Sequence, residues 1–261
     1  MNVAVTSFKP AAEANAPAAI TISGLAKSFR PGRPVFSGIS FDIAPGSIVA
    51  LIGANGAGKS TLLRCIPRLI EPDAGEIRVL GADVTEASRA LRQIRTKVGF
   101  VFQKHNLVGR LSALTNVVHG AQARGLGARA WLHALAPHAV REEAVHCLDR
   151  VGLAAMAAQR ADQLSGGQSQ RVAIARALMQ HPDVVLADEP AASLDPQAGD
   201  EVMQLFASLM REERKTVVFT SHNLAHALSF ADRVIALGGG RVMLDSPSSR
   251  LRESELRDLY V

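Results

Sequence analysis

A chain of 261 residues, of which 48% are hydrophobic, is long enough to build one large domain with a substantial core. The net charge of +5 is modest, the Lys and Arg residues are scattered, and aromatic residues are few, so the composition argues against a dedicated nucleic-acid binder. Charges, Gly or Pro interrupt every apolar run before it reaches about 18 residues, and we therefore expect no membrane-spanning helix.

The first 19 residues and the two cysteines give further expectations. Residues 1–19 are rich in Ala and lack the basic start and apolar centre of a signal peptide, which predicts a flexible tail ahead of a domain over residues 20–261. Cys65 and Cys147 lie far apart, with no CxxC spacing and no His at metal-ligand spacing. We expect both to be reduced thiols that are buried as small hydrophobic side chains.

The apolar pattern predicts an α/β fold. Residues 20–22 and 39–43 alternate between apolar and polar side chains, which predicts half-buried, antiparallel strands near the N-terminus. Four continuous apolar runs follow, separated by helical stretches, as in a parallel sheet that is covered on both faces. These runs are residues 48–52, 98–102, 184–187 and 217–219. Near the C-terminus, residues 233–237 and 241–244 flank three glycines, which predicts a β-hairpin.

Residues 104–163 break this alternation, because they contain no comparable β-branched run and have helical patterns. We expect an inserted helical subdomain, with its clearest helix over residues 141–151. Glu142 and Glu143 would lie at the positive end of that helix, and Gly152 would end it in a left-handed conformation. The predicted apolar stripe consists of Ala144, Val145, Leu148 and Val151.

A phosphate-binding loop is predicted directly after the apolar run at 48–52. Residues 53–60 match the pattern GxxxxGK[ST] and precede a helical stretch, which is the context that this motif requires. Backbone N–H groups and the helix start would hold the phosphates, Lys59 would reach the β and γ phosphates, and Ser60 would offer a hydroxyl to Mg²⁺. The predicted nucleotide-binding residues are Gly53, Ala54, Asn55, Gly56, Ala57, Gly58, Lys59, Ser60 and Thr61. Because Pro67 cannot continue a helix, we expect this helix to end or kink near Ile66.

Two carboxylates follow the apolar run at 184–187. Asp188 and Glu189 come where this buried strand emerges, and Pro190 stops the strand. In open α/β sheets, ligands bind beyond the carboxyl ends of the strands. We expect Asp188 to hold the hydration shell of the metal and Glu189 to orient and deprotonate the attacking water.

Gln103 and His222 follow two other predicted strands. Taken alone, a Gln or a His after a strand is more often an ordinary surface residue. Their expected position at the same sheet edge as Lys59 and Glu189 is what makes them candidate catalytic residues.

A second helix start suited to an anion is predicted at residues 164–168, whose sequence is Leu-Ser-Gly-Gly-Gln. Ser165 and Gln168 have the S-x-x-Q spacing of a capping box, and Gly166 and Gly167 would leave the helix start open to a ligand. An ordinary capped helix and a second phosphate site both fit this spacing.

Together these motifs resemble, in order and spacing, the nucleotide-binding subunits of ATP-binding cassette (ABC) transporters, over about residues 20–261. The Leu-Ser-Gly-Gly-Gln signature is highly specific to that superfamily. The matching segments are residues 53–60, Gln103, 164–168, 184–189, 193–195 and His222. The resemblance implies a P-loop NTPase fold with a mostly parallel core sheet, an N-terminal antiparallel β part and the inserted helical subdomain.

The resemblance also implies a head-to-tail dimer that uses ATP and Mg²⁺. Lys59 and Glu189 of one chain would face Ser165, Gly166, Gly167 and Gln168 of the other, which explains why one chain has two anion sites. The remaining implied roles are adenine stacking for Phe29, Mg²⁺ sensing and coupling to the permease for Gln103, interface stabilisation for Asp195, and γ-phosphate contact for His222. The implied metal ligands are Ser60, Gln103 and Asp188.

Within the superfamily, three stretches are similar to the ATPase subunits of phosphonate importers. They are residues 106–112 with 114–117, residues 191–196, and residues 255–260. The similarity implies a second copy or homologous ATPase subunit, an integral membrane permease, indirectly a periplasmic or lipid-anchored solute-binding protein, and a peripheral location on the cytoplasmic face of the inner membrane. The alternatives are an ATPase for another solute, such as phosphate, an amino acid or a metal complex, and a non-transport ATPase acting on DNA or the ribosome.

Overall fold

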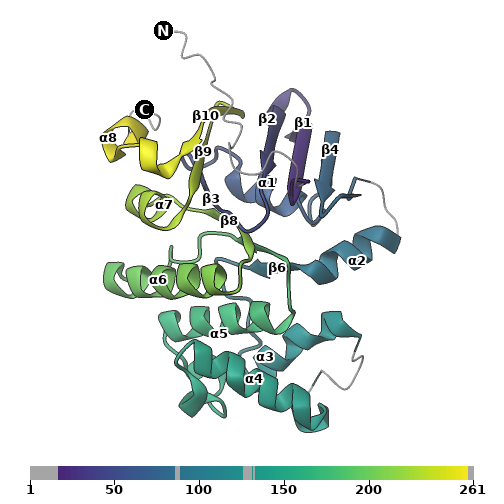
Figure 1. Cartoon of the computed structure of the whole chain (residues 1–261), viewed down its shortest axis with the longest axis vertical. Coiled ribbons are helices and arrows are strands. Elements are labelled where there is room, and N and C mark those ends of the chain that lie inside the picture. The colour runs from purple at the N-terminus through teal and green to yellow at the C-terminus, as the bar shows by residue number, and fades with distance from the viewer. Residues whose placement is uncertain (1–16, 86–88, 126–130, 132, 258–261) are drawn as a thin grey trace. The chain divides into compact units, whose positions relative to one another are not determined.

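Residues 17–85, 89–125, 131 and 133–257 are described by a computed structural model (Figure 1), so most of the predicted N-terminal tail lies outside the described residues. The chain divides into two units, Met1–Ile94 with Met210–Val261, and Arg95–Leu209. Helices α2 (Arg89–Lys97) and α6 (Pro196–Glu212) each contain one of the boundaries. Within the described ranges, no helix is both long and apolar enough to span a membrane.

The first unit begins with an antiparallel sheet in the strand order β2-β1-β4-β5. The strands are β1 (Ile20–Arg30), β2 (Arg33–Ile43), β4 (Ala74–Val79) and β5 (Ala82–Asp83). Register shifts interrupt the β1–β2 pairing at several points, yet Ile20, Ile22, Ile39 and Ile43 all face the core. The predicted antiparallel start is confirmed, and its strands are longer than predicted.

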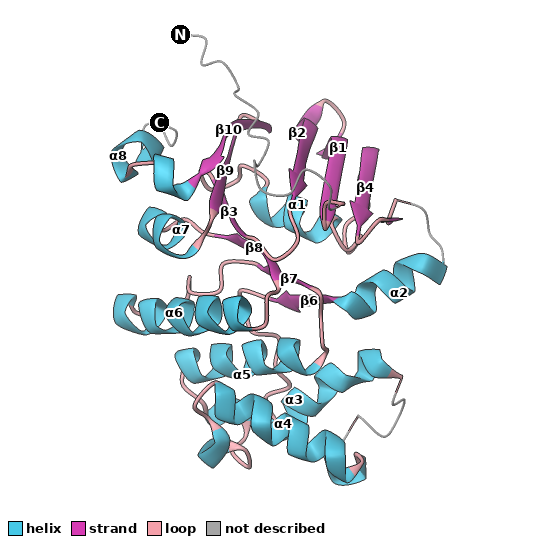
Figure 2. Ribbon diagram, in the orientation of Figure 1, coloured by secondary structure: helices cyan, strands magenta, loops and turns pink. Residues whose placement is uncertain are grey.

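The same unit contains parallel strands that are buried along nearly their whole length. Strand β3 (Ile48–Ile52) pairs in parallel with both β8 (Thr216–Thr220) and β9 (Arg233–Gly238), and β10 (Arg241–Pro247) is antiparallel to β9, which confirms the predicted hairpin. Helix α1 (Lys59–Cys65) packs against β8, and α7 (Leu224–Phe230) packs against β3 (Figure 2). The unit ends with the 3-10 helix η6 (Ser248–Arg250) and α8 (Glu253–Arg257).

A buried arginine joins three strands of this unit. The guanidinium of Arg233 on β9 donates to both carboxylate oxygens of Asp245 on β10, at 2.5 Å, and to the carbonyl oxygen of Asp42 on β2, at 2.6 Å. Both charged side chains are less than 10% exposed. Because a buried ion pair is stable only when its hydrogen bonds are satisfied, this contact fixes the hairpin against the end of β2.

The second unit has two parallel strands, β6 (Val98–Val101) and β7 (Val184–Ala187), and a group of helices. Helices α3 (Ala113–Val118), α4 (His138–Arg150) and α5 (Gly166–Met179) pack against one another. The 3-10 helices among the described residues of this unit are η1 (His119–Arg124), η3 (His133–Leu135), η4 (Ala154–Met156) and η5 (Ala161–Gln163). The regular secondary structure in the described part of residues 104–163 is thus helical, apart from one isolated bridge between Ser112 and Arg160, and residues 104–111 form turns and irregular backbone. The boundaries of an inserted subdomain stay a prediction.

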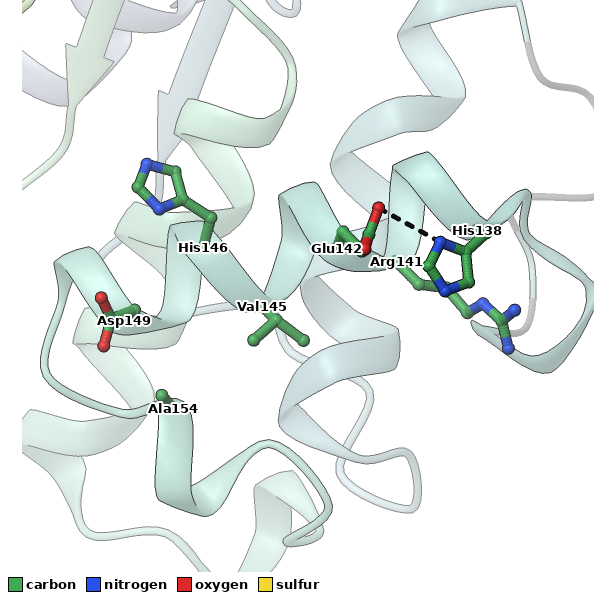
Figure 3. A pocket seen from close by; sticks show the side chains of 7 residues that line it. All are labelled: His138, Arg141, Glu142, Val145, His146, Asp149 and Ala154. Carbon is green, nitrogen blue, oxygen red and sulfur yellow. Dashed lines mark ion pairs between the residues drawn. The ribbon is translucent and has the colours of Figure 1, made fainter.

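Helix α4 corrects two details of the sequence prediction. It begins at His138, with Pro137 as its N-cap, so Glu142 and Glu143 lie beyond the first turn and no acidic residue occupies the positive end. The buried face consists of Val140, Ala144, Cys147 and Leu148. Val145 is 40% exposed, because it lies outside the face of α4 that packs on α3 and α5. It lines an open pocket with His138 and other residues of α4 (Figure 3). Gly152, with a φ of 73°, ends the helix as predicted.

Helix α1 ends at Cys65, which confirms the expected effect of Pro67. The next turn is closed by Arg68, which has a φ of 53° and donates its backbone N–H to the carbonyl oxygen of Cys65 at 2.8 Å. Both Cys65 and Cys147 are buried thiols that form no disulfide, as predicted.

Burial predicts that Cys65 is chemically inert in the folded protein. Its pKa is raised to about 11, mainly because burial disfavours the thiolate. We expect no alkylation of Cys65 by iodoacetamide at pH 8 in the native protein and rapid alkylation after unfolding in guanidinium. Mass spectrometry of both samples tests this expectation, and modification of the native thiol would contradict it.

Candidate functional site

The phosphate-loop motif forms a tight bend between β3 and α1. Gly53, Gly56 and Gly58 have φ values of 147°, 83° and 94°, which side chains disfavour. A Cβ atom at Gly53 would lie 2.3 Å from the carbonyl oxygen of Leu237 on β9, and one at Gly58 would lie 2.8 Å from Cγ1 of Val35 on β2. The loop backbone is therefore held closely by β9 and β2, while residues 54–56 are exposed.

Lys59 places a buried cation inside this bend. The side chain is only 5% exposed, and its Nζ donates to the carbonyl oxygens of Gly53, at 2.7 Å, and Ala54, at 3.2 Å. Ser60 and Thr61 follow in the first turn of α1 and are half-buried. A bend of positive-φ glycines that surrounds a buried ammonium group fits a polyphosphate chain, which needs close backbone approach and positive charge.

The close contact at Gly53 gives a testable consequence for the loop. Gly53→Ala would force its methyl group against backbone, whereas the Cβ of Gly56→Ala would meet no atom within 4 Å, although both residues have positive φ. We expect Gly53→Ala to lower the free energy of unfolding by about 1–3 kcal/mol more than Gly56→Ala does, the usual range for overpacking. Urea unfolding of the two variants measures the difference, and equal stabilities would contradict this packing.

His222 and Phe29 belong to the same unit as the phosphate loop. Strand β8 pairs in parallel with β3, and the N–H of Ser221 donates to the carbonyl oxygen of Leu51 at 3.2 Å, so His222 emerges at the same sheet edge as Gly53. The His222 side chain is exposed. Phe29, near the end of β1, is 62% exposed, so its ring is available for stacking.

A cation that the sequence pattern did not predict lies beside Phe29. The Lys27 Nζ lies 5.5 Å from the centre of the Phe29 ring and donates to Oδ1 of Asp73 at 2.6 Å. Asp73 also accepts the backbone N–H of Ser28, and these hydrogen bonds lower the pKa of its carboxyl group. The i, i+2 spacing of Lys27 and Phe29 places both side chains on one face of the strand, and this spacing was the signal that could have revealed Lys27. Asp73 gave no such signal, because it is 46 residues from Lys27 in the sequence.

In the second unit, the carboxylate motif and Gln103 lie together. Strands β6 and β7 are parallel neighbours, so the residues after them emerge at one edge. Nε2 of Gln103 donates to Oε2 of Glu189 at 3.2 Å. Asp188 is fully buried, and its N–H donates to the carbonyl oxygen of Val101 at 2.9 Å. Glu189 has a φ of 48°, an uncommon conformation for glutamate that sets the direction of its carboxylate.

The predicted capping box is present at the start of α5. The Oγ of Ser165 accepts the N–H of Gln168 at 3.3 Å, and Oε1 of Gln168 accepts the N–H of Ser165 at 2.9 Å. Ser165 and Gly166 are exposed, so the first turn is accessible from solvent. In the same unit, Oδ1 of Asp195 accepts the N–H of Ala198 at 3.0 Å at the start of α6, which gives this residue a structural contact in addition to its predicted interface role.

The predicted metal ligands are divided between the two units, with Ser60 in the first and Gln103 and Asp188 in the second. Among the described residues, no group of three or more His, Cys, Asp or Glu side chains could hold a metal ion alone. Mg²⁺ in nucleotide sites typically takes one or two protein ligands and completes its shell with phosphate oxygens and water, so this sparse set fits Mg²⁺ that arrives with a nucleotide.

Comparisons with known proteins agree with the motifs. The sequence model of the family described as "ABC transporter" matches residues 36–192. A protein named "Phosphonates import ATP-binding protein PhnC" from Stutzerimonas stutzeri is 47% identical over 249 residues, which cover 93% of this chain and 90% of that protein. The protein of the same name from Bordetella parapertussis is 43% identical over 246 residues, which cover 92% and 96%.

A solved structure is also similar to this chain. It is titled a dimeric structure of a post-hydrolysis state of the ATP-binding cassette MJ0796 bound to ADP and Pi, and it superimposes with a TM-score of 0.77 at 34% identity. The superposition covers 88% of this chain and 98% of that one. The family match at residues 36–192 spans the phosphate loop, Gln103, residues 165–168 and Glu189, whereas Phe29, Asp195 and His222 lie outside it.

Proposed function

Because this chain belongs to the ABC transporter family, we propose that it is the ATP-hydrolysing subunit of an importer. In this proposal, a head-to-tail dimer couples ATP hydrolysis to the uptake of phosphonate or a related phosphorus oxyanion through a separate permease. One observation carries the proposal. The chain combines a phosphate loop around the buried ammonium of Lys59 with a Glu189 carboxylate that is held by Gln103 at 3.2 Å. The loop with Lys59 supplies charge compensation for a triphosphate, and Glu189 supplies a base for water.

The hydrolytic step requires little covalent help from the protein. Lys59 neutralises charge on the β and γ phosphates, and His222 contacts the γ-phosphate. Glu189 orients a water molecule and takes one of its protons while the oxygen attacks the γ-phosphorus and the bond to the bridging oxygen breaks. Ser60, Gln103 and Asp188 would hold Mg²⁺, which would supply charge neutralisation for the phosphates when bound.

The dimer explains the second anion site. Residues 165–168 form an accessible helix start with two glycines, and such a start favours a phosphate. In the proposed assembly this turn of one chain closes over the nucleotide of the other, Asp195 stabilises the interface, and Phe29 stacks on adenine. The dimeric state of the similar MJ0796 cassette supports this arrangement.

The solute assignment has a different basis from the ATPase chemistry. It rests on the names of the two PhnC relatives, because solute recognition belongs to other subunits. The proposed partners are an integral membrane permease and, through it, a periplasmic or lipid-anchored solute-binding protein. The chain would then lie on the cytoplasmic face of the inner membrane.

The test is to purify the chain with its permease and solute-binding protein in lipid vesicles and to measure ATP hydrolysis with candidate solutes. We expect methylphosphonate or 2-aminoethylphosphonate to accelerate hydrolysis, and glycine or a metal–chelate complex to leave it at the basal rate. Acceleration by an amino acid or a metal complex alone would overturn the solute assignment. Hydrolysis that depends on DNA or ribosomes instead of the permease would overturn the transport function.

A further inference from the structure

Helix α5 and its C-cap residue Gln180 hold the segment that contains Gln103 on both sides. Near the beginning of β6, Nε2 of Gln180 donates to the carbonyl oxygens of Arg95, at 2.8 Å, Thr96, at 3.1 Å, and Val98, at 3.0 Å. Beyond the end of β6, Arg176 donates from Nη1 to the carbonyl oxygen of Asn106, at 2.6 Å, and from Nη2 to that of His105, at 2.8 Å. Gln103 therefore lies on a segment that is fixed to α5 on both sides.

The backbone held by Arg176 has an uncommon conformation. His105 and Asn106 are consecutive non-glycine residues with φ values of 52° and 50°. A left-handed conformation costs roughly 1–2 kcal/mol for most side chains, although His and Asn tolerate it better than others. The planar guanidinium offers two donors in a fixed fork, which matches two adjacent carbonyl oxygens, whereas a lysine ammonium has no such geometry.

Arg176 also depends on this loop. Burial lowers the pKa of its guanidinium, and within the described part of the chain no carboxylate forms an ion pair with it. Burying a charged group is costly unless it is hydrogen-bonded, and here two backbone carbonyls accept one hydrogen bond each from Nη1 and Nη2 of Arg176. The loop and the arginine thus stabilise each other, and their contact links α5 to the segment after Gln103.

The contact between Arg176 and this loop connects two parts of the proposed active site, the Ser165–Gln168 turn and Gln103. Helix α5 begins at the Ser165–Gln168 turn, and Arg176 lies 11 residues further along, or roughly 16 Å at the helical rise. We propose that Arg176 is a positioning residue that couples the signature turn to Gln103 and, through the 3.2 Å hydrogen bond, to Glu189. This inference rests on the proposed function, in which the partner's nucleotide docks on the signature turn. Displacement of α5 by that nucleotide would then move Gln103 and reorient Glu189, so each site would respond to ATP bound in the other.

The test compares Arg176→Lys and Arg176→Met with Arg171→Met. Arg171 lies on the same helix but forms an ion pair with the exposed Glu201 at 3.2 Å, so its removal controls for loss of an arginine from α5. We expect both Arg176 variants to lower kcat by about 10- to 100-fold, the usual effect of a small misplacement of a catalytic group. The KM for ATP should change less than twofold, and the Hill coefficient for ATP should fall toward 1. Arg171→Met should keep the wild-type kcat and Hill coefficient.

A rescue variant separates positioning from a merely structural role. Glycine adopts positive φ without a steric cost, so adding His105→Gly and Asn106→Gly to Arg176→Lys should restore part of the lost kcat if Arg176 acts by holding this backbone. A structural role would instead lower the melting temperature of Arg176→Lys and leave kcat per folded molecule unchanged. If Arg176→Met fails to fold, Arg176→Lys and its glycine rescue variant still distinguish a positioning role of Arg176 from a structural one.

Two results would overturn the inference: a folded Arg176→Lys variant with wild-type kcat and cooperativity, or no recovery of kcat in the glycine variant. Failure of the proposed function would look different, because the wild-type protein would then hydrolyse no ATP and Lys59→Ala would change nothing.

Discussion

Glu189→Gln is expected to bind ATP as tightly as the wild-type protein and to hydrolyse it roughly 10²- to 10⁴-fold more slowly, the usual contribution of a general base. The amide retains an oxygen that can accept the hydrogen bond from Gln103. It has no basic group, so the attacking water would keep its proton. The loss should therefore fall on kcat, with the KM for ATP nearly unchanged.

Single-turnover hydrolysis and binding of a fluorescent ATP analogue measure the two quantities separately for this variant. Glu201→Gln is the matched control, because Glu201 lies in the same unit, is exposed, and contacts Arg171 and Gln197. A Glu189→Gln variant that hydrolyses ATP within a few-fold of wild type would remove Glu189 from the role of base. A slow variant should also hold the ATP-bound dimer long enough to detect by light scattering.

Lys59→Ala should fail at an earlier step, with the dissociation constant for ATP raised by about 10²-fold or more, because charge-assisted hydrogen bonds are worth about 1.5–3 kcal/mol each. The ammonium is already placed inside the bend by its bonds to Gly53 and Ala54, so little reorganisation would be needed to meet a phosphate. Without it, the loop carbonyls would face the phosphates with no compensating charge.

Equilibrium binding of ATP by calorimetry tests this second variant. Lys97→Ala is a suitable control, since Lys97 is more than half exposed and pairs with Asp183 at 3.4 Å. Circular dichroism should show that Lys59→Ala is folded, because Ala54 still accepts the backbone N–H of Ala57 at 3.1 Å within the loop. Wild-type affinity in the Lys59→Ala variant would exclude this loop as the triphosphate site.

Local sequence patterns were enough to predict the elements that are encoded by a few neighbouring residues. The phosphate loop follows from eight consecutive residues with a strand before and a helix after them, and the end of α1 follows from Pro67 alone. The capping box of α5 is likewise encoded by Ser165 and Gln168, three positions apart. The beginning of α4 was misplaced because residues before 141 gave no clear apolar period, while Pro137 sets the true start.

The sequence by itself determined the α/β class, the phosphate loop, the carboxylates after β7 and the resemblance to ABC ATPases, because each depends on side chains that are close neighbours in the chain. Only the tertiary structure decided which face of α4 is buried, that Lys27 and Asp73 accompany Phe29, and that Arg176 holds the loop after Gln103. Arg176 and His105 are 71 positions apart, and their contact exists only because α5 packs along β6. Contacts of this kind depend on the packing of elements that are distant in the chain, and no periodicity in the amino-acid sequence records that packing.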